Sequence, residues 1–157
     1  MTVEAGDRAP AFTVETTDGP RTLDGLIADG PLVLAFYAED ATPACTTEVC
    51  GFRDEYETLA ELGATVLAVS ADSLQSHRAF LERLGGLPYP LASDPELVLA
   101  EAYGVVDADE GRSYRAVFVV GTDGVVLAAN PRYQPQTVEQ FAAIFEALGF
   151  GAPRPDP

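Results

Sequence analysis

The stretch LVLAFYAEDATPACTTEVCGFRD, Leu32–Asp54, carries the clearest structural pattern of this chain. It opens with a continuous apolar run, Leu32–Tyr37, which is typical of a strand buried on both faces of a sheet. Thr42 and Pro43 follow, and they suit the N-cap and the first position of a helix that runs to about residue 62. A buried strand that leads into a helix is the building unit of an α/β fold.

The rest of the chain alternates between strand-like and helix-like segments. Buried strands joined through helices imply parallel pairing, and a late hairpin adds antiparallel neighbours. We therefore expect a mixed central sheet with helices on both faces. The further expected strands are 12–16, 65–70, 116–120 and 125–129. Three further helices are expected. One opens with a capping box of Asp72 and Gln75 and stops at Gly85, and another runs from Asp94-Pro95 to about Tyr103. The last spans 135–148 and places four apolar side chains on one face: Val138, Phe141, Phe145 and Leu148.

The composition predicts a single domain, residues 1–150, followed by a Pro-rich tail, residues 151–157. The 157 residues are 47% apolar and 22% charged, which is ordinary for a folded protein. The tail has three prolines in seven residues and cannot continue a helix.

The charge excludes several classes of partner. The chain has 25 acidic and nine basic side chains, a net charge of −16, which disfavours nucleic acid and anionic membranes. All nine basic residues are Arg, which fits a surface suited to high salt and equally a bias in base composition. No apolar run approaches the ~18 residues of a membrane span, and no secretory signal is visible. We expect a cytoplasmic protein, in which a pair of cysteines more often serves catalysis or metal binding than a structural disulfide.

Cys45 lies where a helix favours a thiolate. With Thr42 at the N-cap, Cys45 falls in the first turn. The first backbone N–H groups of a helix lack internal partners, and with the helix dipole they stabilise an anion. The Thr42 hydroxyl can donate to a sulfur or to a bound oxygen. The pattern predicts that Cys45 is a nucleophile.

The second cysteine, Cys50, should point away from the protein body. Five residues turn a helix by about 140° and raise it by ~7.5 Å. A disulfide needs Cα atoms within about 7 Å, so an intact helix forbids a bond between Cys45 and Cys50. Local unwinding beside Gly51, a weak helix former, would permit it. The apolar face that carries the first cysteine comprises Cys45, Val49, Phe52, Tyr56 and Leu59.

Other roles for these residues stay open from the pattern alone. Two cysteines in an intracellular chain are often unreactive members of the core. Structural zinc needs four Cys or His ligands, which two cysteines and the single histidine, His77, do not supply. His77 shares a helical face with three leucines, which indicates packing or capping rather than a general base, so a Cys–His hydrolase lacks support.

Short motifs along nearly all of the chain match one known family. On these motifs the chain resembles the peroxiredoxins of the Q-type, or bacterioferritin-comigratory-protein, branch. The motifs are GDRAPAF (6–12), FY (36–37), TPACT (42–46), CGFRD (50–54), SADS (70–73), SHRAF (76–80), LASD (91–94), YGV (103–105), RAVFVV (115–120) and DG (123–124).

The resemblance implies an α/β, thioredoxin-like fold with a central mixed sheet, helices on both faces and an N-terminal β extension. It implies an antioxidant thiol peroxidase that reduces hydrogen peroxide and organic hydroperoxides, needs no metal or organic cofactor, and is recycled by thioredoxin. The branch is often monomeric, so we expect a monomer or a weak dimer.

The resemblance also implies the roles of four residues. Cys45 would be the peroxidatic cysteine and Cys50 the resolving cysteine of an intramolecular disulfide. Thr42 would supply the active-site hydroxyl. Arg115 would supply a guanidinium near the sulfur, whereas without the resemblance a surface ion pair is the better interpretation of Arg115.

One position departs from the family pattern. The motif Pro-x3-Thr-x2-Cys places a proline at position 38, where this chain has Ala38. In the family that proline shields the reactive cysteine and shapes its loop. The same spacing recurs at Pro43, Thr47 and Cys50, but there the nucleophile would lie in mid-helix, away from the free N–H groups.

Two other functions remain open at this level. A thiol–disulfide oxidoreductase on the same fold usually carries Cys-x2-Cys, whereas the spacing here is Cys-x4-Cys. A peroxide-sensing or non-catalytic thioredoxin-fold protein is favoured only by Ala38.

Overall fold

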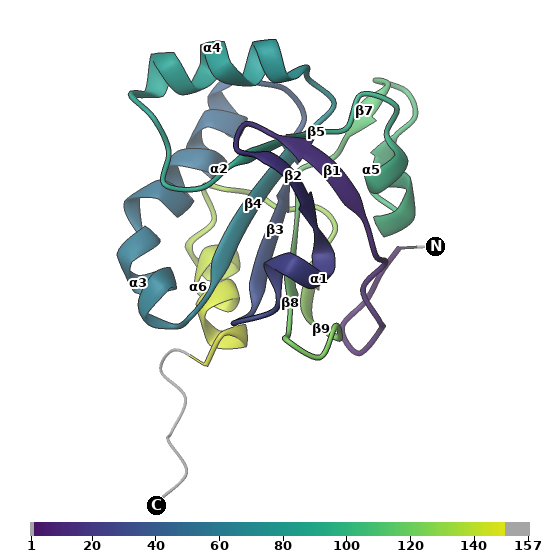
Figure 1. Ribbon diagram of the computed structural model, residues 1–157, viewed down its shortest axis with the longest axis vertical. Coiled ribbons are helices and arrows are strands. Elements are labelled where there is room, and N and C mark those ends of the chain that lie inside the picture. The colour runs from purple at the N-terminus through teal and green to yellow at the C-terminus, as the bar shows by residue number, and fades with distance from the viewer. Residues whose placement is uncertain (1, 150–157) are drawn as a thin grey trace, which may run out of the picture.

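A seven-stranded mixed sheet forms the centre of the computed structural model, which describes residues 2–149 (Figure 1). The predicted tail, 151–157, lies outside the described residues. The strand order is β2-β1-β5-β4-β3-β8-β9, and β6 and β7 form a separate small ribbon. The strands are β1 (Thr13–Thr16), β2 (Gly19–Thr22), β3 (Leu32–Phe36), β4 (Thr65–Ser70), β5 (Leu91–Ser93), β6 (Val106–Asp107), β7 (Arg112–Ser113), β8 (Ala116–Val120) and β9 (Val126–Asn130). The helices are α1 (Leu23–Leu26), α2 (Pro43–Asp54), α3 (Tyr56–Glu61), α4 (Leu74–Leu84), α5 (Val98–Tyr103) and α6 (Val138–Ala147).

Strand β3 lies between a parallel and an antiparallel neighbour. It pairs parallel with β4 and antiparallel with β8, and all five of its residues are buried. Strand β4 pairs parallel with β5, and β8 pairs antiparallel with β9. The predicted mixed sheet is confirmed, and its order follows because the early strands connect through helices while β8 and β9 form a hairpin.

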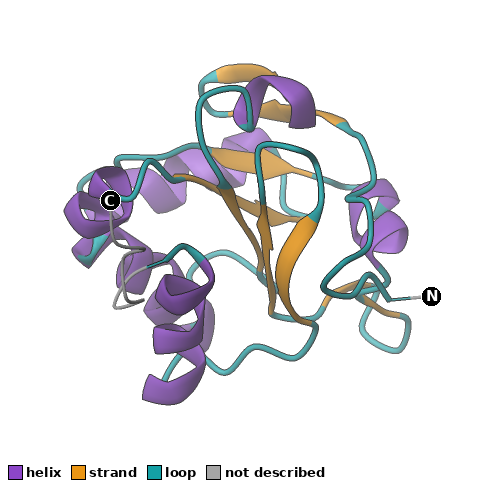
Figure 2. Cartoon of the chain, turned by 90° about the horizontal axis from the view of Figure 1, so that it is seen from below, coloured by secondary structure: helices purple, strands orange, loops and turns teal. Residues whose placement is uncertain are grey.

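The side chains of β3 alternate between two hydrophobic cores. Leu32, Leu34 and Phe36 face a core completed by α1 and α5. Val33 and Ala35 face a second core, which receives side chains from α2, α3, α4 and α6. Helices therefore cover both faces of the sheet, as predicted (Figures 1 and 2). Cys45 belongs to the second core.

The predicted N-terminal β extension is present as the hairpin of β1 and β2. Strand β1 pairs antiparallel with both β2 and β5, and so adds two strands to one edge of the sheet. Gly19, at the turn, has a φ of +92°, which favours glycine.

The structure corrects four details of the expected helices. The helix predicted over 43–62 breaks at Glu55, whose ψ of 16° ends α2 before α3 begins. The helix predicted from Asp94-Pro95 begins only at Val98, because Leu97 has a left-handed backbone. Val138, predicted to lie on the buried face of the last helix, is 75% exposed.

The fourth correction is the cap of α4. Ser73 caps this helix by accepting a hydrogen bond from the Ser76 N–H at 3.1 Å. Asp72, the predicted cap, instead accepts hydrogen bonds from the Asp40 N–H and the Ser70 hydroxyl. Ser and Asp both suit an N-cap, so composition alone does not separate two adjacent candidates. Within residues 2–149, no helix is long and apolar enough to span a membrane.

Candidate active site

Cys45 lies buried in the first turn of α2, directly after the loop that leaves β3. The N-cap residue Thr42 has an extended backbone (φ −75°, ψ 150°), and Pro43 occupies the first helical position, as predicted. Cys45 is 1% exposed and shares its core with Val49 and Phe52 of the same helix. The helix start thus presents its free N–H groups where the thiol lies, which favours an anion.

The Thr42 side chain turns back toward the preceding loop. Its hydroxyl donates a hydrogen bond to the Glu39 carbonyl oxygen at 3.1 Å, while its own carbonyl accepts the Thr46 N–H at 2.8 Å. The hydroxyl oxygen keeps its lone pairs, and a rotation about the side-chain bond is enough to aim the O–H at another acceptor.

A buried carboxyl lies one turn after the cysteine. Glu48, one turn after Cys45, is 2% exposed, and neither of its carboxyl oxygens has a hydrogen-bond partner among the described residues. Burial raises the pKa of Glu48 well above its usual value, the neighbouring Cys45 sulfur raises it further, and the Arg115 guanidinium lowers it. Glu48 is therefore close enough to both groups to interact with each of them electrostatically.

Arg115 enters the site from the residue just before β8. Its Nε is buried and without a partner in the described part of the chain. The surface ion pair that we would have expected without the family resemblance is not found among residues 2–149. Its carbonyl oxygen accepts the Tyr133 N–H at 2.7 Å, which ties the segment after β9 to the site. Burial, and to a smaller degree Glu48, raises the pKa of Tyr133 above its usual value.

A surface pocket of about 270 Å³ adjoins these residues. Ala38, at the position where the family pattern has proline, forms part of its wall. Arg115 and Tyr133 also line it, and the Arg132 guanidinium lies over the Tyr114 ring at 3.5 Å from the ring centroid. The complete lining is Ala38, Asp107, Arg112, Ser113, Tyr114, Arg115, Arg132, Tyr133 and Gln134.

Cys50 lies further along α2 and is only partly buried. Both thiols are free, and α2 is intact from Pro43 to Asp54. The Arg53 guanidinium, which forms an exposed ion pair with Asp54, lies within electrostatic reach of Cys50. Thr42 and Cys45 thus lie at one helix start, and Cys50 lies on the more exposed side of that helix. Arg115 lies within electrostatic reach of Glu48, one turn after Cys45.

Sequence reasoning missed Glu48. It lies three residues after Cys45, which brings it to the same side of a helix, and a charged residue in an otherwise apolar stripe was the available signal.

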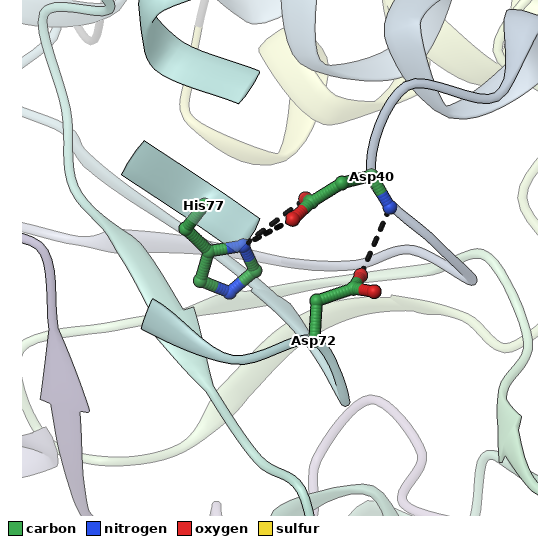
Figure 3. A group of neighbouring side chains, drawn as sticks. All are labelled: Asp40, Asp72 and His77. Atoms are coloured by element: carbon green, nitrogen blue, oxygen red, sulfur yellow. Dashed lines mark hydrogen bonds and ion pairs between the residues drawn. The ribbon is translucent and has the colours of Figure 1, made fainter. Parts of the chain in front are cut away.

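A second buried polar cluster supports the loop before α2 (Figure 3). His77 of α4 is 0% exposed, and its Nδ1 lies 2.8 Å from Oδ2 of Asp40. Burial alone would raise the pKa of Asp40, but hydrogen bonds from His77 and two hydroxyl groups outweigh it and hold that pKa below its usual value. The sequence pattern predicted packing or capping for His77, and the structure shows a buried ring that contacts the Asp40 carboxyl.

The ligand atoms of Asp40, Asp72 and His77 lie within 4.8 Å of one another, a spacing that also suits a metal ion. Here, however, hydrogen bonds account for the arrangement. The Asp40 carboxyl binds His77, Tyr37 and Ser76, and Asp72 binds the Asp40 N–H.

Comparison with known proteins identifies the family. Residues 5–129 match the AhpC/TSA family. The chain belongs to this family. It is 38% identical over 139 residues to the putative peroxiredoxin bcp of Coxiella burnetii, a match that covers 84% of this chain and 91% of that one. It is 38% identical over 133 residues to peroxiredoxin Bcp of Bacillus subtilis, covering 81% of this chain and 84% of that one.

Solved structures agree with this assignment. The crystal structure of peroxidoxin BcpB from Mycobacterium tuberculosis superposes with a TM-score of 0.84 at 31% identity, over 94% of this chain and 97% of that one. The predicted thioredoxin-like peroxiredoxin fold and the resemblance to the Bcp and Q-type branch are therefore confirmed. The protein is a thiol-dependent peroxidase.

Proposed function

We propose that Cys45 is the peroxidatic cysteine and that Cys50 resolves it. The observation that carries this proposal is the burial of Cys45 in the first turn of α2, within electrostatic reach of the same carboxyl, Glu48, that Arg115 also reaches. A thiol at a helix start with a nearby cation is the environment that makes a cysteine nucleophilic.

In the first step, the Cys45 thiolate attacks the terminal oxygen of a hydroperoxide. The S–O bond forms as the O–O bond breaks, the sulfur is oxidised by two electrons to a sulfenic acid, and the departing oxygen takes up a proton and leaves as water or an alcohol. Arg115 offsets the negative charge on the departing oxygen, and the Thr42 hydroxyl, once released from the Glu39 carbonyl, donates a hydrogen bond to the peroxide.

In the second step, the Cys50 thiol attacks the sulfur of the sulfenic acid. A disulfide forms within the chain and water leaves. Because α2 is helical through both cysteines, the segment between them must unwind before the two sulfurs can meet. A thioredoxin-type dithiol then reduces the disulfide by thiol–disulfide exchange, which restores both thiols and oxidises the partner.

The same proposal covers the setting of the reaction. A cycle that returns to two free thiols suits the reducing cytoplasm, in which the protein would act as an antioxidant. A disulfide closed within one chain requires no second subunit, so we propose a monomer or a weak dimer, with residues 1–150 acting as one domain and without a nucleic-acid or membrane partner.

The experiment is peroxide oxidation followed by intact mass and peptide mapping. In the wild type, stoichiometric hydrogen peroxide should remove two hydrogen atoms from the mass and join the Cys45 and Cys50 peptides. Cys45→Ser should abolish peroxide consumption. Cys50→Ser should still consume one equivalent of peroxide and should lose turnover with thioredoxin.

Two results would contradict the assignment. If Cys45→Ser consumes peroxide at the wild-type rate, another group is the nucleophile. If Cys50→Ser keeps its full activity with thioredoxin, Cys50 has no resolving role.

A further inference from the structure

The loop between β3 and α2, residues 37–42, is held by buried polar contacts that the peroxidase mechanism does not use. The Asp40 carboxyl accepts hydrogen bonds from Tyr37 at 2.6 Å and from Ser76 at 2.7 Å, and it contacts His77 at 2.8 Å. The Asp40 N–H donates to Asp72 at 2.9 Å. One residue of the loop is thus joined to α4 and to the segment that follows β4 (Figure 3).

The hydrogen positions in this cluster follow from its acceptors. His77 Nε2 lies 2.8 Å from the Ala92 carbonyl oxygen, which can only accept, so this nitrogen carries a proton. Nδ1 faces the Asp40 carboxyl, so a proton lies between these two groups as well. Two hydroxyl groups also donate to that carboxyl, which favours its charged form. The contact is therefore a buried hydrogen bond between the imidazole ring and the Asp40 carboxyl, whose side chains are 0% and 6% exposed.

The loop has a strained backbone and lacks the proline of its family. Ala41 has a φ of +66°, a left-handed conformation that residues other than glycine rarely adopt. Such a conformation persists only where neighbouring contacts impose it. Asp40 comes directly before Ala41, and Thr42 directly after it. Ala38 leaves φ unrestrained at the position where a proline would fix it.

We propose that Asp40 is a positioning residue for the peroxidase reaction. Through its hydrogen bond with His77 it fixes the loop, and through the loop it sets the place of Thr42 and of the free N–H groups around Cys45, a role that the family assigns to the proline absent here. The proposal rests on the assignment of Cys45 as the peroxidatic cysteine.

The test compares two substitutions of a buried aspartate. Asp40→Asn removes the charge from the loop anchor. Asp94→Asn is the matched control, because Asp94 is also buried (6% exposed) but caps α5, on the opposite face of the sheet, through the N–H groups of Leu99 and Ala100. In each protein three quantities are measured: the second-order rate of Cys45 oxidation by hydrogen peroxide, the rate of Cys45 alkylation by iodoacetamide, and amide exchange over residues 38–46.

Asp40→Asn should slow oxidation at least tenfold, leave alkylation no slower than in the wild type, and speed amide exchange over 38–46. In Asp94→Asn, Cys45 should be oxidised within twofold of the wild-type rate. This should hold even if the melting temperature falls as much as it does in Asp40→Asn. Adding His77→Phe to Asp40→Asn should cause little further loss, since the two groups act as one unit.

Two results would overturn the proposal: an Asp40→Asn protein that oxidises at the wild-type rate, or an equal loss of rate in Asp94→Asn. If the wild type itself fails to react with peroxide, the assignment of Cys45 has failed instead. Amide exchange then tests by itself whether Asp40 anchors the loop. Unchanged protection of residues 38–46 in Asp40→Asn would overturn that role.

Discussion

At the scale of single residues, the buried acid Glu48 makes the stability of the fold depend on pH. Its pKa in the folded state is raised, chiefly by burial, above the value of the unfolded chain. The folded protein therefore holds this proton more tightly than the unfolded chain does. Between the unfolded and the folded pKa, the contribution of Glu48 to stability falls as pH rises.

Glu48→Gln should remove this pH-dependent loss of stability, because glutamine does not titrate. The variant should match the wild type near pH 4 and become progressively more stable than it as pH rises toward neutrality, measured by urea unfolding at each pH. A stability difference that is constant from pH 4 to pH 8 would show that Glu48 does not titrate differently in the folded state.

Ala38 lies in the wall of the pocket beside Arg115. We expect peroxides to approach Cys45 through this pocket, where the size of residue 38 would limit them. Ala38→Pro adds two methylene groups to this wall. One methylene in a pocket changes discrimination by about 10-fold or more. We expect the rate with cumene hydroperoxide to fall about tenfold relative to the rate with hydrogen peroxide, measured as Cys45 oxidation. An unchanged ratio would mean that bulky substrates enter elsewhere.

The surroundings of a residue can be inferred from the sequence when the residues that make them up lie close to it in the chain. The burial of Cys45 and its place at a helix start follow from Thr42, Pro43 and the apolar spacing, all within one helix. The hydrogen bond of Asp40 with His77 joins residues 37 positions apart, and only the pairing of β3 with β4 brings them together. Periodicity along one helix carries no information about such a partner.

At the scale of elements, the proposed resolving role of Cys50 requires α2 to be stable enough to hold Cys45 and weak enough to open toward Cys50. Gly51 lowers its stability by roughly 1 kcal/mol relative to Ala. A Cβ at this position would meet the Phe141 ring at 3.5 Å, an ordinary contact, so alanine fits without displacement. The Tyr89 hydroxyl also donates to the Val49 carbonyl, a contact that opening of this segment would disturb.

Gly51→Ala should therefore slow the second step and leave the first unchanged. A stabilisation of ~1 kcal/mol corresponds to about a fivefold slower disulfide formation, if the helix must unwind first. Rapid quenching and mass analysis separate the sulfenic acid from the disulfide. Disulfide formation at the wild-type rate in Gly51→Ala would show that the cysteines meet without opening this turn.

The elements themselves followed largely from the sequence, and their ends followed less well. The strand 65–70 was predicted with its observed bounds because its apolar run is continuous. The break at Glu55 carries no glycine or proline to mark it. The late start of α5 follows from the left-handed backbone of Leu97, and the Asp94 carboxylate reaches the N–H groups of Leu99 and Ala100 across that turn. Capping at that distance in sequence lies outside the local patterns that mark a helix start.

At the scale of the whole molecule, the net charge of −16 opposes the compact state. In residues 2–149, arginines form ion pairs with only three acidic side chains, Asp54, Glu39 and Glu110. Within residues 2–149, most acidic side chains therefore repel one another without an arginine ion pair to offset them. This repulsion reaches across the surface at low ionic strength, where the Debye length is roughly 30 Å at 0.01 M, and shrinks to about 3 Å at 1 M.

Salt should consequently stabilise this protein. Relief of about 1 kcal/mol of repulsion raises the melting temperature of a chain this long by roughly 2–4 °C, and we expect at least that rise between 0.01 M and 1 M sodium chloride at pH 7.5. The control is the same pair of salt concentrations near pH 4.1, the isoelectric point, where the net charge approaches zero and the rise should disappear. A rise that is equal at both pH values would trace to a general effect of salt on hydrophobic burial. A melting temperature that does not change with salt at pH 7.5 would mean that repulsion between acidic side chains lowers the stability of the fold very little. The absence of lysine would then be better explained by a bias in base composition than by adaptation to high salt.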